Sequence, residues 1–378
     1  KLIGQPPLYP ARPLTDEALE ELIFYGTSPG QRDAVAAEPE KSAPTAPVEL
    51  DTPAYDAGYL SKNVIRDEPL HGCAFNGAVG MSNHLRDAVV LLHSPKSCAY
   101  ITYQTISSTG RRRLFERGTL LPSSLLPNLL SPEMDESDMV FGGTDKLMEA
   151  VRAAVARKPK AVVVVSACPA GIIGDDIDQV KTLSTPDCPV VPIKADGNLA
   201  GDYLQGMLMA YTQLAKALID PAAAPRPRVV NIVFEKVVAN NTESNFQTVR
   251  GWRERMGGRV NCRSLCSTTC DALRDFCSAS LNLLAYQDYT GKILKDFFTK
   301  EYGCQFYAEQ FPVGFAETER WLRGVGAHFA SGEAAEAIIA ENAAAYTRRI
   351  AGVQTALRGK RLMIVTYNHD VDWILRAA

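Results

Sequence analysis

The chain contains four consecutive valines, Val162–Val165, followed by a cysteine and a glycine-containing turn, in the segment AVVVVSACPAGIIGDDIDQVK at 161–181. A half-exposed strand would alternate apolar and polar residues, so this unbroken apolar run predicts a central parallel strand covered on both faces. The proline and glycines that follow predict a turn, and the aspartates after them suit the positive dipole end of a helix. Cys168 is therefore expected at the carboxyl edge of a parallel sheet, where open α/β folds bind ligands.

Two further cysteines have similar surroundings. Cys73 lies in HGCAFNGAVG and Cys98 in LLHSPKSCAY, beside small residues or proline that let the backbone approach a bulky group. Cys98 follows Cys73 by 25 residues and Cys168 follows Cys98 by 70, intervals too long for a zinc ribbon or knuckle. A lone cysteine after a valine strand is more often a small buried hydrophobe. Three thiolates from separate loops instead suit an iron–sulfur cluster, and they leave a cubane one ligand short that a partner subunit could supply.

Five segments occur in a characteristic order. They are GCAFNGA around Cys73, HSPKSCAY around Cys98, MDESDMVFGGTDKLMEAV at 134–151, SACPAGIIGDDIDQV at 166–180 and VVPIKADGNLAGDYLQGM at 190–207. In order and spacing they resemble the component 1 (dinitrogenase-type) proteins of nitrogenase and their relatives. The resemblance covers roughly residues 65–330 and is far more specific than any single motif.

The resemblance implies that Cys73, Cys98 and Cys168 bind an iron–sulfur cluster at a subunit interface, either P-cluster-like or 4Fe–4S. It also implies three other components: a homologous component 1 subunit in a heterotetramer, an ATP-dependent iron–sulfur reductase, and a larger iron–sulfur cofactor in the complex. The cysteine that binds this cofactor in nitrogenase matches Tyr286 here, within LNLLAYQDY at 281–289. A beta-type subunit and a divergent alpha-type subunit both account for this difference. The interval between the first two cysteines and the GNLAGDYLQG pattern favour the beta type.

Composition narrows the class of protein. The 378 residues are enough for two or three domains with cores of their own. The 40 Lys and Arg residues nearly balance 43 Asp and Glu residues, so nothing favours nucleic-acid binding. No apolar run reaches the length of a membrane span, and the first residues show no signal-peptide pattern. Nine cysteines in a chain of this length indicate a reducing compartment, and we expect a cytoplasmic location.

The fold class that we predict is α/β, with repeated doubly wound Rossmann-like domains and parallel sheets. Residues 1–60 predict an extended N-terminal arm, residues 61–222 a first α/β domain carrying the cluster cysteines, and residues 226–330 a second α/β domain. Residues 331–378 predict a helical connector and the first strand and helix of a third α/β domain. Because one strand and one helix cannot bury a core, we expect most of that third domain to be disordered, removed or omitted.

Local patterns predict the individual elements. Helices are expected over Asn83–His93, Asp145–Lys158, Tyr203–Leu218, Ser244–Met256, Asp271–Phe298, Glu317–Phe329 and Glu333–Leu357. Strands are expected at the start of 190–197, at 229–237 and within 303–314, and an inserted loop at 107–133.

A second cysteine group comprises Cys262, Cys266, Cys270 and Cys277. These residues could hold a second cluster, but they match no family motif, which favours core cysteines. His84 and His93 are also candidate ligands, although a histidine near the end of an element is more often a capping or core residue.

The resemblance implies an enzyme, one subunit of a nitrogenase-like reductase, and among its relatives we expect methylthio-alkane reduction as the specific reaction. A non-catalytic scaffold for the maturation of a nitrogenase-type iron–sulfur cofactor would share the fold and the three cysteines. A metal-free α/β module that binds a small molecule in an interdomain cleft is a third alternative.

Overall fold

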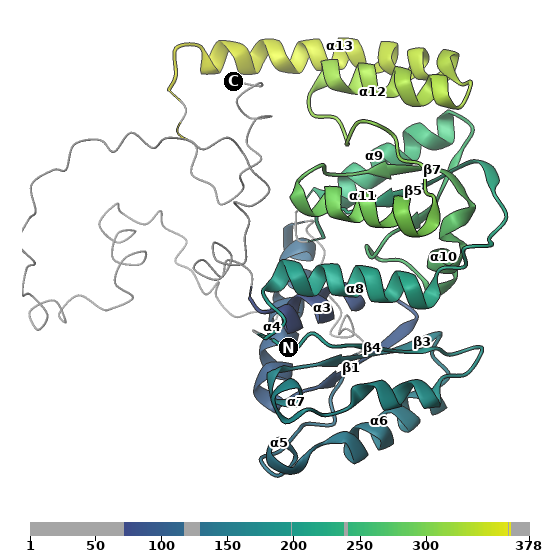
Figure 1. The fold of residues 1–378 in the computed structure, drawn as a ribbon. Coiled ribbons are helices and arrows are strands. Elements are labelled where there is room, and N and C mark those ends of the chain that lie inside the picture. The colour runs from purple at the N-terminus through teal and green to yellow at the C-terminus, as the bar shows by residue number, and fades with distance from the viewer. Residues whose placement is uncertain (1–71, 117–128, 198, 238–240, 362, 364–378) are drawn as a thin grey trace, which may run out of the picture. The chain divides into compact units, whose positions relative to one another are not determined.

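Two parallel sheets organise the described part of the chain in the computed structural model (Figure 1). The structure describes residues 72–116, 129–197, 199–237, 241–361 and 363. The chain divides into two units, 1–56 and 57–378, and all described residues belong to the second. The predicted N-terminal arm at 1–60 lies outside the described part, and so do the predicted strand and helix of a third domain at 360–378, apart from residues 360, 361 and 363.

The first sheet has four parallel strands in the order β2-β1-β3-β4. They are β1 (Ala88–His93), β2 (Leu129–Leu130), β3 (Ala161–Ser166) and β4 (Val190–Ile193). Every residue of β3 is buried, and its neighbours are β1 and β4. The prediction of a central parallel strand at the valine run is therefore confirmed, as is the α/β class with parallel sheets.

Alternate valines of β3 pack into two different cores. Val163 and Val165 belong to a cluster that includes residues of α3 (Ala74–Ser82) and α8 (Tyr203–Leu218). Val162 and Val164 belong to another cluster that includes residues of α6 (Thr144–Ala156). Helices thus cover both faces of the sheet, which is why the strand has no polar residue until it ends.

The α3 and α8 helices pack against each other at very short range. A Cβ on Gly206 of α8 would lie 1.8 Å from the carbonyl oxygen of Ala74 in α3. Only glycine allows this approach, and it fixes the start of α3 against the start of α8.

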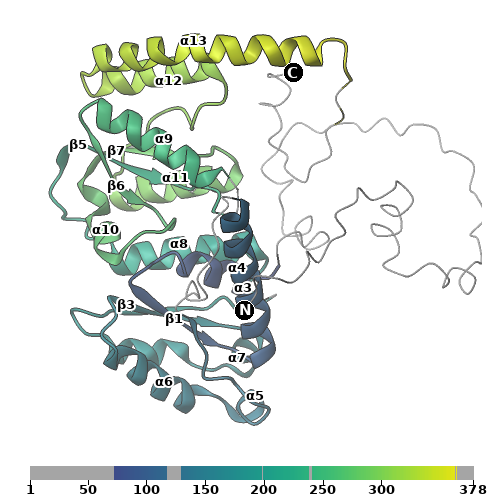
Figure 2. The same ribbon diagram turned by 180° about the vertical axis from the view of Figure 1, so that it is seen from behind.

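The second sheet has three parallel strands in the order β6-β5-β7. They are β5 (Arg226–Val233), β6 (Arg259–Arg263) and β7 (Ala279–Leu284). One face shares the core of α3 and α8 through α10 (Cys270–Arg274) and α11 (Tyr289–Tyr302). The other face packs on α9 (Thr242–Arg255), α12 (Phe315–His328) and α13 (Gly332–Leu357). Figures 1 and 2 show α8 between the two sheets.

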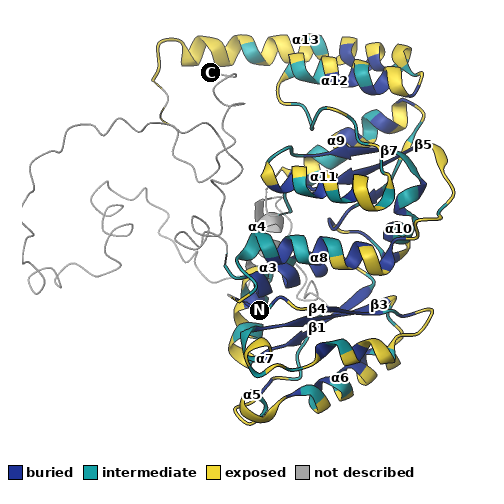
Figure 3. Ribbon diagram, viewed as in Figure 1, coloured by how far each residue is buried: buried dark blue, intermediate teal, exposed yellow. Residues whose placement is uncertain are grey.

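Figure 3 shows the strands as buried and the outer faces of the surrounding helices as exposed. The helices predicted at α6, α8, α9, α12 and α13 are confirmed to within about two residues at each end. The predicted strand at 190–193 is β4, and the one at 229–237 overlaps β5.

The helix predicted over Asn83–His93 is wrong. Asn83 is the C-cap of α3, and residues 88–93 form β1, all of them buried. The run AVVLLH has apolar residues at helical spacings only because every position is apolar apart from the last. Such a run is equally typical of a strand that is covered on both faces.

The single helix predicted over Asp271–Phe298 is also wrong. The segment contains α10, a 3-10 helix at Asp275–Ser278 (η4), β7 and α11. Polar Asn282 lies fully buried in β7, where its side-chain oxygen accepts a hydrogen bond of 2.9 Å from the amide of Asn231 in β5. This partner on the neighbouring strand removes the cost of burying the amide, and local sequence does not reveal it.

Three other predictions need correction. The segment 303–314 contains an isolated bridge between Phe306 and Asn282 instead of a strand. The expected loop at 107–133 begins as helix, because α4 spans Lys96–Glu116. The turn predicted after Cys168 is a short helix, α7 (Cys168–Ile173), which precedes a 3-10 helix at Ile177–Leu183 (η3).

Candidate functional site

The three sequence-predicted cysteines each lie at the start of a helix. Cys73 is the N-cap residue of α3, Cys98 lies in the first turn of α4, and Cys168 is the first residue of α7. All three side chains are half-buried, and none forms a disulfide. Cys98 and Cys168 come shortly after the carboxyl ends of β1 and β3, which are neighbours in the sheet, so that both lie at the same sheet edge.

The thiols of these cysteines interact electrostatically. Burial raises the pKa of Cys98, the charges of Cys73 and Cys168 raise it further, and a hydrogen bond from Ser97 opposes the rise. Because interactions between charges weaken with distance, these effects indicate that the sulfur atoms of Cys73 and Cys168 lie near that of Cys98. The structure therefore brings together the three residues that the sequence selected.

The start of α8 holds Cys73 in position. Cys73 forms an isolated antiparallel bridge with Asp202. The backbone N–H of Ala74 donates to the carbonyl of Gly201 at 3.1 Å. Asp202 is the N-cap of α8 and forms a reciprocal capping box with Gln205, with hydrogen bonds of 3.1 and 3.2 Å. This capping box fixes the loop to which the first cysteine is attached.

Cys168 is packed against a glycine. A Cβ on Gly197, which follows β4, would lie 2.0 Å from the Sγ of Cys168. Gly197 also has a φ of +53°, a conformation that residues with a Cβ rarely adopt. The backbone N–H of Ala167 donates to the carbonyl of His93 at 3.1 Å, which ties the exit of β3 to the exit of β1.

The two candidate histidines bind protein groups. His93 is fully buried, and its Nε2 lies 2.8 Å from Oδ2 of Asp175. The same carboxylate accepts hydrogen bonds from the backbone N–H of Gly143 at 3.0 Å and from the hydroxyl of Thr144 at 3.3 Å. The Nδ1 of His84 lies 3.4 Å from the backbone N–H of Ser267. Both histidines thus connect segments of the fold.

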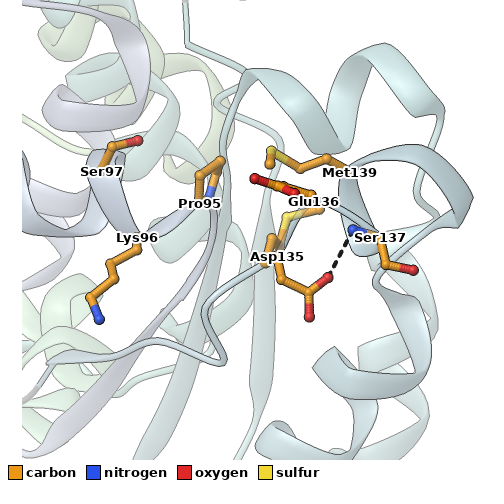
Figure 4. Close-up of a pocket in the computed structure, with 8 residues that line it drawn as sticks. Pro95, Lys96, Ser97, Asp135, Glu136, Ser137 and Met139 are labelled. Carbon is orange, nitrogen blue, oxygen red and sulfur yellow. Dashed lines mark hydrogen bonds between the residues drawn. The ribbon is translucent and has the colours of Figure 1, made fainter.

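The MDESD motif forms one side of a pocket beside the start of α4 (Figure 4). Met134 bridges Pro95, and its backbone N–H donates to the carbonyl of Ser94 at 3.1 Å, which aligns the motif with the segment before Cys98. The pocket has a volume of about 560 Å³. It is lined by Pro95, Lys96, Ser97, Met134, Asp135, Glu136, Ser137 and Met139. The backbone N–H of Asp138 holds the pKa of Asp135 below its usual value.

Exposed apolar side chains lie on the elements that carry or flank the cysteines. They include Phe141, which is 86% exposed, Ile172 at 70% and Val140 at 67%. We call the following set the apolar rim: Tyr100 and Ile101 on α4, Val140 and Phe141 on α5 (Asp138–Phe141), Ile172 on α7, and Leu199. A group of large exposed apolar side chains is typical of a protein–protein interaction site.

Comparison with known proteins assigns the family. The sequence model of the protein family described as nitrogenase component 1 type oxidoreductase matches residues 73–378. The chain belongs to this family. It is 29% identical over 307 residues to the nitrogenase molybdenum-iron protein alpha chain of Methanothermobacter marburgensis, a match that covers 78% of this chain and 63% of that protein. It is 28% identical to the nitrogenase iron-molybdenum cofactor biosynthesis protein NifE of Rippkaea orientalis, over 78% of this chain and 61% of that protein.

A solved structure described as "Nitrogenase Cp1 at pH 6.5" superposes with a TM-score of 0.63 at 26% identity, covering 77% of this chain and 56% of that one. The nitrogenase component 1-like chain thus spans between about half and two thirds of the length of these relatives. No helix in its described part is both long and apolar enough to cross a membrane.

The donor set of the nitrogenase component 1-like chain fits an iron–sulfur cluster. Three half-buried thiols from three helix starts supply the soft ligands that such clusters prefer. Among the described residues, no three His, Cys, Asp or Glu side chains are grouped so as to hold a metal ion by themselves. Cys73, Cys98 and Cys168 are the residues that could hold such a cluster.

Three members of the second cysteine group are part of the core, and the fourth, Cys277, is half-buried and packs against it. Cys262, Cys266 and Cys270 are buried, each with a different partner. The Sγ of Cys262 contacts the hydroxyl of Thr268 at 3.4 Å, and the Sγ of Cys266 accepts from Arg263 at 3.4 Å. Burial raises the pKa of Cys262 to about 12. These contacts agree with the expectation of core cysteines.

Sequence reasoning missed Gly197 and Gly206 as site residues. Both lie within the segment 190–207 that carries the family resemblance, so the motif contained them. Their role comes from contacts with residues that are remote in sequence: Gly197 lies against Cys168, and Gly206 lies against Ala74. The capping box at Asp202 and Gln205, in contrast, is visible in the sequence as an Asp-x-x-Gln pattern.

Proposed function

We propose that this chain is an alpha-type subunit of a nitrogenase-like component 1 complex, in which Cys73, Cys98 and Cys168 hold an iron–sulfur cluster at the interface with a homologous subunit. The complex takes electrons from an ATP-dependent iron–sulfur reductase and reduces a small substrate. The observation that carries the proposal is that three half-buried thiols lie at three helix starts, with Cys73 and Cys168 near enough to Cys98 for their charges to raise its pKa.

The apolar rim supports a protein partner. Side chains as exposed as Phe141 and Ile172 are costly in water, and burial against another subunit removes that cost. The same partner would supply the ligands that the three thiols leave open. A ligand set divided between two chains requires an interface at the cysteines.

The chain's own residues would tune the site. When bound, an iron–sulfur cluster accepts and releases single electrons. Ser97, which hydrogen-bonds to Cys98, favours the thiolate form that a metal ligand requires. Burial of the same thiol acts in the opposite direction, so partial exclusion of water and hydrogen bonding to sulfur would together set the potential. Gly197 leaves the space that the Sγ of Cys168 occupies.

The relatives support the alpha type over the beta type that the cysteine interval favours. Those reported above are an alpha chain and a NifE protein. NifE is named as a cofactor biosynthesis protein, and this likeness supports a second candidate function, a scaffold on which a nitrogenase-type cofactor is matured.

For the substrate we propose a methylthio-alkane, which would be cleaved at a carbon–sulfur bond. Tyr286, just after β7, has replaced the cofactor cysteine that the resemblance predicts. This substitution argues against reduction of dinitrogen by the nitrogenase route. Its test is the release of methanethiol from such a substrate in the presence of reductase and ATP, compared with ammonia formation under dinitrogen.

The cluster is tested by measuring iron and acid-labile sulfide and by recording EPR spectra of the anaerobically purified complex. In Cys168→Ala we expect the cluster signal to be lost or altered and the iron content to fall. The matched control is Cys188→Ala, since Cys188 is buried in the core away from the three cysteines. An iron-free native complex, after proper reconstitution, would contradict the proposal and favour a metal-free binding module.

Turnover separates the enzyme from the scaffold. With reductase and ATP, an enzyme reduces substrate over many cycles. A scaffold instead transfers a cofactor to an apo-enzyme and shows little reduction of its own. Measuring both activities on one preparation distinguishes the two functions.

A further inference from the structure

A side-chain hydrogen bond joins the helices that carry two of the three candidate ligands. The hydroxyl of Thr102 in α4 donates to the side-chain oxygen of Asn76 in α3. Cys73 and Cys98 lie at the starts of the same two helices. Thr102 is only 1% exposed, so its hydroxyl depends on a partner within the protein. The bond therefore connects α3 to α4 inside the fold.

The two bonded residues each lie about one helical turn after a cysteine. Thr102 follows Cys98 by four residues, and Asn76 follows Cys73 by three. Residues three or four apart in a helix lie on the same face, one above the other. The faces of α3 and α4 that meet at the bond between Asn76 and Thr102 are therefore the faces on which the two cysteines lie.

The nitrogen of the Asn76 side-chain amide lies close to the segment that leads into Cys73. A Cβ on Gly72 would lie 3.1 Å from Nδ2 of Asn76. Gly72 has a φ of +99°, a conformation that residues with a Cβ rarely adopt. Asn76 is the third residue of α3 after its N-cap, Cys73, and in a capping box the side chain at this position reaches back to the N-cap. The amide of Asn76 thus lies between α4 and the chain entering the first cysteine.

Thr102 differs from another threonine of the same helix. Thr105 is exposed, and its hydroxyl donates to the carbonyl of Ile101, one turn earlier in α4, at 3.0 Å. Such a bond to the preceding turn is common for a threonine within a helix. The hydroxyl of Thr102 instead donates to a side chain of another helix. This contrast provides a matched control.

We propose that Asn76 and Thr102 are positioning residues that fix the placement of Cys73 relative to Cys98. A metal centre requires its ligands in a set geometry, and the groups behind the ligands hold them in it. Without the bond, the starts of α3 and α4 move more freely and hold a cluster less tightly. The effect on a cluster rests on the proposed function, whereas the placement of the two helix starts does not.

The test removes the hydroxyl and keeps the shape of the side chain. Thr102→Val replaces the hydroxyl by a methyl group, Thr102→Ser keeps the hydroxyl, and Thr105→Val is the matched control. In the anaerobically purified complex, we expect Thr102→Val to release iron to a chelator about fivefold faster than the parent, the order of effect of one buried hydrogen bond. Its EPR spectrum should also differ from that of the parent. Thr102→Ser and Thr105→Val should match the parent in both measurements.

A double-mutant cycle shows whether the two residues act as a pair. Asn76→Leu breaks the bond from the other side, so the comparison does not depend on the folding of one variant. The double variant Asn76→Leu/Thr102→Val should release iron no faster than the more strongly affected single variant, because the second change removes a bond that is already broken. Effects that simply multiply would overturn the proposal.

Amide hydrogen exchange of the same complexes, followed by mass spectrometry, reports the placement of the helices without reference to iron. Thr102→Val should raise exchange in peptides from the starts of both α3 and α4, and Thr105→Val only around its own position. Unchanged exchange in α3 would overturn the proposal, as would faster exchange with parent-like iron release and EPR spectrum. A parent complex without iron would instead refute the proposed function, and the exchange rates would still decide whether the pair fixes the two helix starts.

Discussion

Gly197 lies directly against Cys168, and a Cβ at that glycine would come within 2.0 Å of the Sγ atom. The two residues follow neighbouring strands, β4 and β3, and they meet at the carboxyl edge of the first sheet. The position of the third predicted ligand therefore depends on the absence of a side chain 29 residues further along the chain.

This relationship predicts that Gly197→Ala displaces Cys168 and reduces the iron content of the purified complex by at least half. The matched control is Gly174→Ala. Gly174 also has a positive φ, +74°, but nothing lies within 4 Å of a Cβ there. Both variants bear the conformational cost of a left-handed alanine, about 1 kcal/mol. Equal iron contents in the two variants would show that only backbone strain, and not the contact with sulfur, matters.

Asp175→Ala should destabilise the fold. The Asp175 carboxylate, with a side chain only 5% exposed, binds the fully buried His93 and the backbone N–H of Gly143. Removing it leaves these donors unpaired in the core, which costs about 2–4 kcal/mol. The measurement is the free energy of unfolding in urea. Asp187→Ala, at an exposed position, serves as the control and should stay within about 0.5 kcal/mol of the parent.

Glu235→Gln should alter the pH dependence of stability. Glu235 is 5% exposed and pairs with Arg263 at 2.8 Å. Burial raises its pKa above 4.5, and this effect outweighs the attraction of Arg263. A carboxyl group with a raised pKa in the folded state binds its proton more tightly there than in the unfolded chain. Its contribution to stability is therefore greatest below about pH 4.5 and is lost as the pH rises through the folded-state value.

Urea unfolding of parent and Glu235→Gln between pH 4 and 7 isolates this group, since other carboxyl groups titrate equally in both. We expect the parent to lose stability relative to the variant as the pH rises. A relative gain over the same range would mean that the ion pair with Arg263 outweighs burial.

Phe141→Asp should weaken assembly with the partner subunit. Phe141 is 86% exposed at the apolar rim, and an aromatic side chain buried at the centre of an interface commonly contributes about 2 kcal/mol, or roughly thirtyfold in affinity. The readout is the dissociation constant of the complex by sedimentation. Val353→Asp on α13, at a position 50% exposed and outside the apolar rim, is the control. Equal effects of the two substitutions on the dissociation constant would show that the apolar rim is not part of the interface.

The sequence by itself determined the parallel α/β class and several helices, and it selected the three cysteines as candidate ligands. The Val162–Val165 run predicts a strand because a strand that is buried on both faces has apolar residues at every position. Tyr203–Leu218 is a helix with the predicted bounds, because its apolar positions have helical spacing and a capping box precedes them. For AVVLLH at 88–93 the same logic failed, since a short apolar run has no period that distinguishes a strand from a helix.

Only the tertiary structure decided which residues meet. Gly197 against Cys168 and Gly206 against Ala74 are contacts between segments far apart in the sequence. Each depends on how strands and helices pack, and no local period or propensity encodes that packing. The cysteines could be selected one by one from their motifs, but their common neighbourhood arises because three helix starts are brought together around the carboxyl edge of one parallel sheet.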